Sequence, residues 1–312
     1  MPGLVELQNE AKGKITHDNP SGAIFYLLDK KREYLKSLSQ KTGRNTILYF
    51  SAFLQKPEYK DTIIGDRDLN LLMGVVHKLD KTKGLDLILH TPGGEVSATE
   101  QIIKYLRSIF NGNIRAIIPQ MAMSAGSMIA VSCKSIIMGK QSCLGPFDPQ
   151  LNNLPCQSVL KEFYRAVEDV KRNPSSLGLW QTIISKLNPT FLTLCEQSDL
   201  LSQELTDEIL SASDYADDVK ERIKKVFCDN TDSKSHSRHI DIDRCKKTGL
   251  HIEDLEADQE IQDLVLSIHH CCMLLGDMSN LIKTVENNEG KVFTTHIPQH
   301  NPNFVRPVML KQ

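Results

Sequence analysis

Short apolar runs alternate with segments of helical periodicity between residues 46 and 138, and this alternation constrains the fold more than any other feature. Strand patterns cover residues 46–53, 85–90, 114–119 and 135–138, and helical patterns cover residues 66–79, 96–110 and 124–132. Strands that are joined through helices run parallel, and their sheet has to be covered on both faces. The sequence therefore predicts an α/β fold of βαβ-type units around a mostly parallel sheet.

The segments on either side of this alternation differ from it in pattern. The first 20 residues are polar, and residues 22–42 predict a helix. Beyond Gly145 the patterns are mainly helical, over residues 155–171, 177–187, 190–212, 214–228 and 258–286. The tail from Gly290 contains prolines and predicts irregular structure. We therefore expect a flexible N-terminal arm, a core, and a C-terminal helix with an irregular tail, over residues 1–20, 21–250 and 251–312.

Composition narrows the class of protein. Lys and Arg number 37 and Asp and Glu number 39, so the net charge of -2 argues against a protein dedicated to nucleic-acid binding. The N-terminus lacks the apolar stretch of a signal peptide, and no run is long and apolar enough for a membrane span. We therefore expect a soluble cytoplasmic protein with no membrane span and no nucleic-acid partner.

The cysteines and histidines do not indicate a metal centre. The eight cysteines form no CxxC pair and have no zinc-type spacing with histidine, and several lie in apolar runs. His269, His270, Cys271 and Cys272 are consecutive, but adjacent residues on a helix point to different faces. We interpret them as core residues with reduced thiols, and we expect neither a metal nor a cofactor.

Two turns stand out because each follows a buried strand and opens a helix. In the first, LHTPGG, Gly93 and Gly94 carry no Cβ and so leave backbone N–H groups open to a ligand. In the second, AMSAGSMIA, Ser124 lies where a strand gives way to an apolar helix. Neighbouring parallel strands bring both turns to one edge of the sheet. The N–H groups of Gly94 and Ala125 would then form an oxyanion hole beside the Ser124 hydroxyl, as acyl transfer requires.

These motifs, followed by IIMGKQSCLGPFDPQ, resemble the serine dehydrogenase proteinase family. That family belongs with the Clp protease proteolytic subunit and signal peptide peptidase A in the ClpP/crotonase superfamily. The resemblance runs from about Ile47 to about Leu266. It implies a ClpP/crotonase-like superhelix of ββα units with a helical C-terminal extension and assembly into homo-oligomeric rings or stacks. It also implies a Ser124 nucleophile, with oxyanion N–H groups from the Gly93–Gly94 turn and Ala125.

The motifs do not assign the general base. The Clp enzyme carries a histidine after the strand that follows the nucleophile, whereas this chain has LGPFDPQ there. Signal peptide peptidases use a lysine from a downstream helical region, and a lysine among apolar residues gives up its proton more readily. Lys186, between Ile184 and Leu187, is the first candidate, and Lys161 is the second.

A histidine is the other candidate base. In the Clp-like pattern the triad acid lies roughly a dozen residues before a Gly-Leu pair, and His236 precedes Gly249 and Leu250 at a similar distance. Asp148 follows a Gly-Pro turn; it either serves that turn or holds a basic residue near the site. The base is therefore open between Lys186, Lys161 and His236.

The sequence thus predicts a cytosolic serine peptidase, or a related amide or ester hydrolase, that acts on a peptide or protein substrate. Two other functions remain open. One is an acyl-thioester enzyme of the crotonase type, although a serine at the helix-opening turn argues against it. The other is a non-catalytic oligomeric scaffold of the same fold that has lost its base. The chain contains no phosphate-binding P-loop motif, so an ATPase or regulatory partner would be a separate chain.

Overall fold

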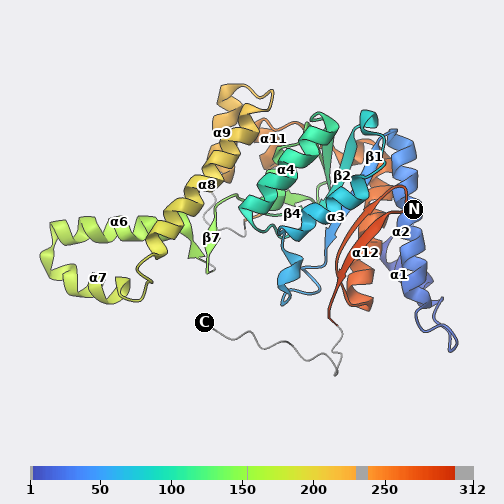
Figure 1. The fold of residues 1–312 in the computed structure, drawn as a ribbon, viewed down its shortest axis with the longest axis horizontal. Helices are drawn as coiled ribbons and strands as arrows, with labels where there is room; N and C mark the ends of the chain where they lie inside the picture. Colours follow the sequence, from blue (N-terminus) through green and yellow to red (C-terminus); the bar gives the residue numbers. More distant parts are fainter. Residues whose placement is uncertain (1–2, 153, 230–237, 299–312) are drawn as a thin grey trace.

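The computed structural model describes residues 3–152, 154–229 and 238–298, and a seven-stranded sheet lies at the centre of these residues (Figure 1). The strands follow the order β10-β5-β3-β2-β1-β11-β12 across the sheet. Their bounds are β1 Asn45–Ser51, β2 Leu85–His90, β3 Ile114–Ile118, β5 Ser135–Met138, β10 Ile252–Asp254, β11 Leu281–Asn287 and β12 Val292–His296. The strands from β10 to β1 pair in parallel, so the predicted α/β fold with a mostly parallel sheet is confirmed.

The C-terminal part of the sheet differs from the prediction. α12 (Gln259–Met278) ends earlier than the predicted helix, and β11 then pairs antiparallel with β1 and with β12. The apolar residues Leu281 and Ile282 continue the helical pattern of α12, which is why the sequence suggested a longer helix. The β-branched residues of β11 favour a strand once β1 is available for pairing. The tail predicted to be irregular therefore begins with the edge strand β12.

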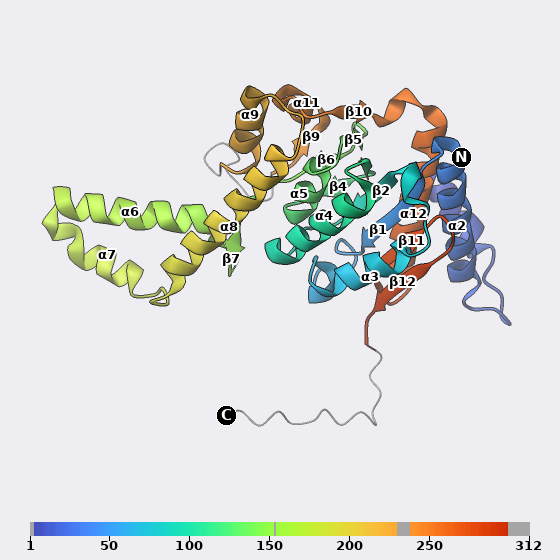
Figure 2. The same cartoon turned by 45° about the horizontal axis from the view of Figure 1, so that its top comes forward.

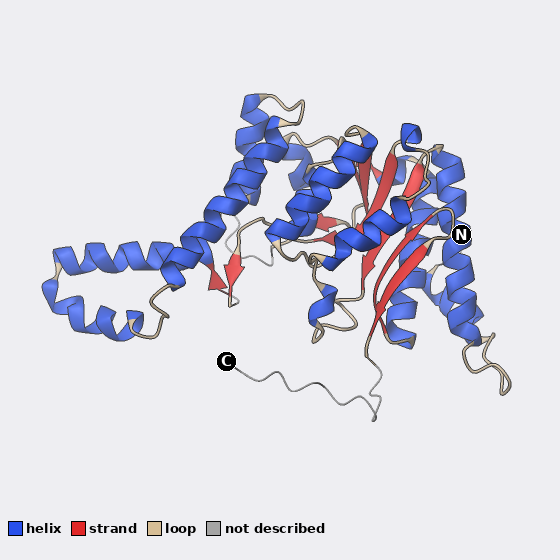
Figure 3. Cartoon of the chain, in the orientation of Figure 1, coloured by secondary structure: helices blue, strands red, loops and turns tan. Residues whose placement is uncertain are grey.

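Helices cover both faces of the sheet (Figures 2 and 3). One face carries α1 (Leu4–Lys12), α2 and α12, and the other carries α3, α4 and α5. The further bounds are α2 Gly22–Thr42, α3 Arg67–Val76, α4 Val96–Phe110 and α5 Ala125–Val131. Side chains alternate between the faces along each strand, so Leu87 and Leu89 pack on the α4 side and Ile88 packs on the α12 side. With both faces covered, the carboxyl edge of the parallel strands is where a ligand would bind.

Residues 4–12 form a packed helix, α1 (Leu4–Lys12), where the sequence suggested a flexible arm. Leu7 and Ala11 are fully buried against α2 and α12. These two residues lie four positions apart and share one helix face, while the polar residues between them face solvent. The polar composition of the segment therefore concealed a short amphipathic helix.

A helical arm, defined here as residues 156–200, projects away from the sheet (Figure 1). It consists of α6 (Cys156–Arg172), α7 (Leu177–Ile184) and the first part of α8 (Phe191–Ser211). The second part of α8 belongs to the core, where Leu205 and Ile209 are buried. The remaining elements are α9 Asp217–Phe227, α11 Ile242–Thr248, β4 Met121–Ala122, β6 Cys143–Leu144, β9 Ile240–Asp241, β7 Gln150–Leu151 and β8 Leu154–Pro155.

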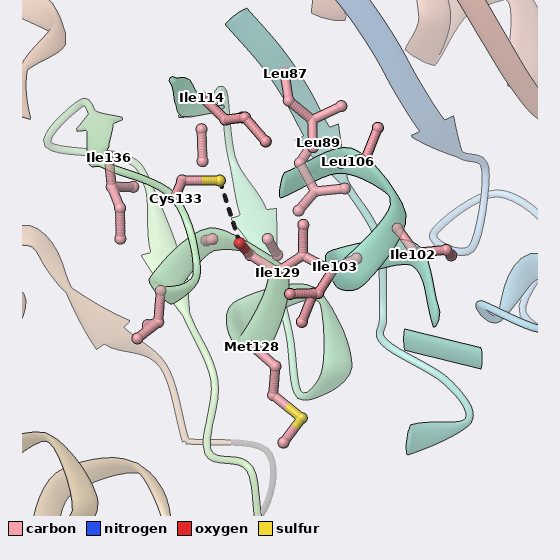
Figure 4. Packing of buried hydrophobic residues seen from close by; sticks show 14 of the residues in the cluster. Leu87, Leu89, Ile102, Ile103, Leu106, Ile114, Met128, Ile129, Cys133 and Ile136 are labelled. Carbon is pink, nitrogen blue, oxygen red and sulfur yellow. Dashed lines mark hydrogen bonds between the residues drawn. The ribbon is translucent and has the colours of Figure 1, made fainter. Parts of the chain in front are cut away.

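The short helix α5 is held firmly by the core. All of its residues are buried, and Met128 and Ile129 lie among the side chains of β2 and α4 (Figure 4). The Sγ of Cys133 donates a hydrogen bond to the carbonyl oxygen of Ile129 at 3.2 Å. Because a close-packed interior resists displacement, the residue that precedes α5 is fixed in position. That residue is Ser124.

Candidate active site

Ser124 lies between β4 and α5 in a backbone conformation that residues with a Cβ rarely adopt. Its φ is 50° and its ψ is -120°, a conformation that costs on the order of 1–3 kcal/mol and is found mainly at functional sites. The side chain is half-buried, and its hydroxyl does not cap α5. The N–H groups of Gly126 and Ser127 donate instead to the carbonyl oxygens of Met123 and Ser124, both at 2.8 Å. The Ser124 hydroxyl is therefore not engaged by the first turn of its own helix.

The glycine turn lies directly against this serine. The N–H of Thr91 donates to the carbonyl oxygen of Met121 at 3.2 Å, and the N–H of Met123 donates to that of Thr91 at 3.0 Å. Gly93 has a φ of 99°, and a Cβ there would lie 2.7 Å from the Cβ of Ser124. Only glycine fits this position, both for its conformation and for the close approach. The two turns are therefore in contact, as the sequence predicts.

Gly94 is required for a different reason from the one the sequence suggested. A Cβ on Gly94 would lie 2.2 Å from the carbonyl oxygen of Ile64. The N–H of Ile64 donates to the carbonyl oxygen of Gly93 at 2.8 Å, and the N–H of Glu95 donates to that of Ile64 at 3.0 Å. The missing Cβ thus lets the turn pack against the Ile64 segment, whereas the sequence suggested that it opens the oxyanion site.

Two backbone N–H groups beside Ser124 are free. Among the described residues, the N–H groups of Gly94 and Ala125 donate no hydrogen bond, whereas that of Gly93 donates to the Thr91 hydroxyl at 3.2 Å. The position that a Cβ on Gly93 would occupy lies 3.1 Å from the nitrogen of Ala125. The glycine turn and the first residue of α5 therefore meet next to the serine. Free N–H donors in such a place can stabilise the alkoxide that forms during acyl transfer.

Ser124 lines a cavity of about 490 Å³, which is within the usual size range of ligand sites. Apolar side chains form much of its wall, among them Met128, Phe147 and Leu201. Glu95 is the charged residue of this lining within the described part of the chain. The full lining is Ile63, Pro92, Gly93, Gly94, Glu95, Val96, Ser97, Ser124, Met128, Phe147, Pro149, Gln150, Ser198 and Leu201.

A buried ion pair supports the Ile64 segment from behind. Lys283 of β11 donates to both carboxylate oxygens of Asp68 at 2.8 Å and to the carbonyl oxygen of Ile63 at 2.8 Å. The Tyr49 hydroxyl donates to Asp68 at 3.1 Å. Burial lowers the pKa of Lys283, against the opposing effect of Asp68. This network connects β1 and β11 to the segment that holds the glycine turn.

The sequence did not reveal this support. Lys283 and Asp68 are 215 residues apart. The sequence pattern around each of them indicates that its element is partly buried, but it does not indicate that the two residues form a pair. A lysine within the apolar strand LIKTVEN was the available signal, because a lysine is rarely fully buried without a partner.

The structure places neither candidate lysine in the Ser124 cavity of its own chain. Lys186 lies between α7 and α8 and is exposed, so the burial expected from its neighbours Ile184 and Leu187 is absent. Those neighbours are themselves only half-buried. Lys161 on α6 is also exposed and lies 3.9 Å from Asp229. Both lysines belong to the arm, which projects away from the sheet (Figure 2), and neither lines the cavity.

The histidine candidate and Asp148 have different outcomes. His236 lies outside the described residues. Asp148 is buried, at 1% exposure, between two residues of the cavity lining, Phe147 and Pro149. Its position next to the cavity keeps the role of holding a basic residue open.

Two of the remaining histidines lie on the other face of the sheet. His90, the last residue of β2, stacks on Phe50 with ring centroids 5.0 Å apart and meets His269 of α12 at 4.8 Å. Burial lowers the pKa of His90 to about 3 and the pKa of His269 well below its ordinary value. Both rings are therefore neutral at physiological pH. Cys271 and Cys272 are buried in the same layer, as expected for core residues.

The fold and the two contacting turns define the class as a ClpP-like α/β protein with a serine at a strand-to-helix turn. The family model of ClpP-like SDH-type serine proteinases matches residues 19–265, and the chain belongs to this family. Two relatives are uncharacterized proteins of Methanocaldococcus jannaschii. MJ1495 is 27% identical over 75% of this chain and 75% of its own length, and MJ0137 is 29% identical over 67% of this chain and 66% of its own length.

None of the helices within the described ranges combines the length and the apolar composition needed to cross a bilayer.

Proposed function

We propose that the protein is a serine peptidase in which Ser124 attacks the carbonyl carbon of a peptide bond. The observation that carries this proposal is the strained Ser124 turn in contact with Gly93, next to two free N–H groups at a cavity. In the proposed reaction, Ser124 Oγ bonds to the carbonyl carbon, a base takes its proton, and the Gly94 and Ala125 N–H groups hold the oxyanion. Collapse to an acyl-enzyme releases the amine, and water then releases the acid.

Fluorophosphonate labelling tests this proposal, because the probe reacts only with an activated serine. We expect the wild type to be labelled and Ser124→Ala to lose labelling completely while keeping its unfolding midpoint. Ser21→Ala, at an exposed serine before α2, is the control that should label like the wild type. Labelling of Ser124→Ala at the wild-type rate would refute the nucleophile assignment.

The base belongs to the same proposal. Because neither Lys186 nor Lys161 lines the cavity of its own chain, a lysine base would come from the arm of another copy, and His236 is the rival. Lys186→Met, Lys161→Met and His236→Gln separate these candidates. A lysine base should give activity that still rises above about pH 8, whereas a histidine base should give a plateau by about pH 7.5.

A mixing experiment tests whether base and nucleophile come from different copies. Ser124→Ala and Lys186→Met are each inactive if both residues are required. Mixed assemblies of the two variants regain part of the activity only if Ser124 of one copy pairs with Lys186 of another. An active Lys186→Met together with an inactive His236→Gln would replace the lysine mechanism by a Ser–His mechanism.

Homo-oligomerisation is therefore part of the proposal. The arm exposes large apolar side chains, which monomeric proteins rarely gather on one element. They include Tyr164, Leu177, Leu179, Ile183, Leu194 and Leu200. We propose that a second copy of this chain covers them. The eight free cysteines support the cytoplasm as the compartment, since disulfides are rare there.

A non-catalytic scaffold is the second candidate function. It is favoured by one observation: no lysine or histidine among the described residues lines the Ser124 cavity. A well-folded wild type that resists fluorophosphonate labelling at every pH between 6 and about 9.5 would favour the scaffold.

A further inference from the structure

Glu95 occupies a position that the proposed chemistry does not use. It directly follows Gly94 and precedes the first residue of α4. It lines the Ser124 cavity and also a neighbouring cavity of about 420 Å³, and Ile63 is likewise shared by the two. The two cavities therefore adjoin at Glu95, beside the proposed oxyanion donor.

The carboxylate of Glu95 is available to a ligand. Its side chain is exposed and accepts no hydrogen bond from the N–H groups of α4. No ion pair or side-chain hydrogen bond joins it to any residue in the described ranges. Two other acidic residues nearby, by contrast, have partners: Asp68 is paired with Lys283, and Glu100 of α4 with Lys104.

We infer that this site selects peptide substrates that carry a positive charge next to a bulky apolar side chain, and that Glu95 selects the charge. The inference rests on the proposed peptidase function. The apolar wall at Met128, Phe147 and Leu201 accommodates the apolar side chain. Among the described residues of the lining, Glu95 supplies the one charge, so a cationic group is its complement.

The position of Glu95 next to Gly94 gives a physical reason for this preference. A carboxylate close to the oxyanion donors repels the negative charge that develops there during attack. A lysine or arginine side chain of the substrate that pairs with Glu95 removes this repulsion. The charge pair therefore stabilises the transition state as well as the bound peptide.

The neighbouring cavity does not oppose a cationic side chain. After Asp68 and Lys283 are set aside as a pair, its charged lining beyond Glu95 consists of Asp61 and Asp66 against Lys60 and Arg67. A cationic side chain that extends past Glu95 thus meets a surface with equal numbers of acidic and basic groups, and the preference for a positive charge comes from Glu95.

Matched peptides test the inference. We would measure kcat/KM for internally quenched peptides that are identical except for lysine, norleucine or glutamate at one position, scanned along a leucine-containing sequence. An exposed charge pair contributes modestly, so at the best position we expect lysine to exceed norleucine by about two- to fivefold. Added salt should reduce this ratio because it screens exposed charges.

Substitutions of Glu95 assign the preference to this residue. Glu95→Gln should bring the lysine-to-norleucine ratio close to unity, and Glu95→Lys should shift the preference to the glutamate peptide. Glu100→Gln, which removes a carboxylate of α4 outside the cavity lining, should keep the wild-type ratio. A wild type without a preference for lysine, or a ratio that Glu95→Gln leaves unchanged, overturns the inference.

A binding measurement separates this result from the fate of the peptidase proposal. If the wild type hydrolyses no peptide, the proposed function fails, and fluorescence anisotropy of dye-labelled peptides on Ser124→Ala decides the inference. Tighter binding of the lysine peptide that disappears in the double variant Ser124→Ala/Glu95→Gln supports selection by Glu95. Equal binding of the three peptides, or no binding, overturns it.

Discussion

The core and the arm are both built from amphipathic elements, but they differ in how much of their apolar surface they bury. In the core, Phe50 and Phe110 are 0% and 2% exposed. In the arm, Leu179 and Tyr164 are 64% and 58% exposed, although Trp180 next to Leu179 is only 7% exposed. A sheet that is covered on both faces can be stable by itself. The arm packs along one side only, and its other side is suited to contact with another molecule.

The same contrast holds for charges. The core contains ion pairs that solvent does not reach, such as Lys283–Asp68 and Lys31–Glu286. The arm carries pairs such as Lys171–Glu168, whose side chains are 68% and 54% exposed. A buried charge depends on its partner, whereas an exposed charge is stabilised by water. The segment that holds the glycine turn is supported by a buried pair, through the contact of Lys283 with the Ile63 carbonyl.

The two regions should differ most in how the free energy of unfolding responds when one lysine is removed from each. Lys283→Met leaves the Asp68 carboxylate buried and unpaired, and we expect it to lower the free energy of unfolding by about 3–5 kcal/mol. Lys171→Met, the matched change in the arm, should not alter it measurably. Urea unfolding followed by circular dichroism gives both values.

A second variant distinguishes the loss of the ion pair from a packing defect that the methionine itself could cause. Lys283→Met/Asp68→Leu removes both charges and should recover part of the lost stability, since apolar replacements of buried pairs are often tolerated. Equal stability of Lys283→Met and Lys171→Met would show that the core pair is not buried as described.

Lowering the pH should destabilise the core before it destabilises the arm. Unfolded His90 binds a proton below its ordinary pKa of 6.5, but folded His90 binds one only below about 3. The unfolded state thus takes up more protons in this window, and stability falls as pH drops from about 7 towards 3. Between pH 7 and pH 5, His90 alone should remove about 2 kcal/mol. The arm contains no histidine.

Urea unfolding at both pH values measures this loss. His90→Phe should flatten the pH dependence, because phenylalanine can occupy the site between Phe50 and Phe53 without titrating. Part of the dependence should remain through His269, which packs against His90 from α12. The single tryptophan, Trp180, reports the arm separately by its fluorescence. An identical pH dependence of wild type and His90→Phe would contradict the assignment.

The sequence predicted the parts of the site that depend on local order. Leu85–His90 and Val96–Phe110 have the bounds that their apolar patterns predict, and the helix ends at Asn111 in a left-handed conformation. The contact between Gly93 and Ser124 followed from two adjacent parallel strands. These features are set by residues close together in the chain or by a topology that few arrangements satisfy.

The parts that depend on distant residues could not be predicted. Lys186 has apolar neighbours in sequence, but whether they are buried depends on how the arm packs, and in this chain Ile183 is 42% exposed. The support of Lys283 for the Ile63 segment depends on β11, which the helical pattern of α12 obscured. The general base could not be predicted for the same reason, because its identity depends on which residues of the folded or assembled protein lie next to Ser124.

The smallest expected effect on stability is also the one that tests what the exposed side of the arm is for. Leu179→Ser/Ile183→Ser should change the free energy of unfolding of the monomer by no more than about 0.5 kcal/mol per site, since both side chains are exposed, at 64% and 42%. It should nevertheless lower the particle mass measured by light scattering, because the apolar contact between copies is lost. Phe25→Ser, at a residue of the core surface that is 59% exposed, should leave that mass unchanged.

A wild type that stays at 35.1 kDa at micromolar concentration, or an arm variant that assembles like the wild type, would mean that the arm does not join copies of this chain. A monomeric wild type excludes a lysine base from another copy as well, and His236 then becomes the base to test first.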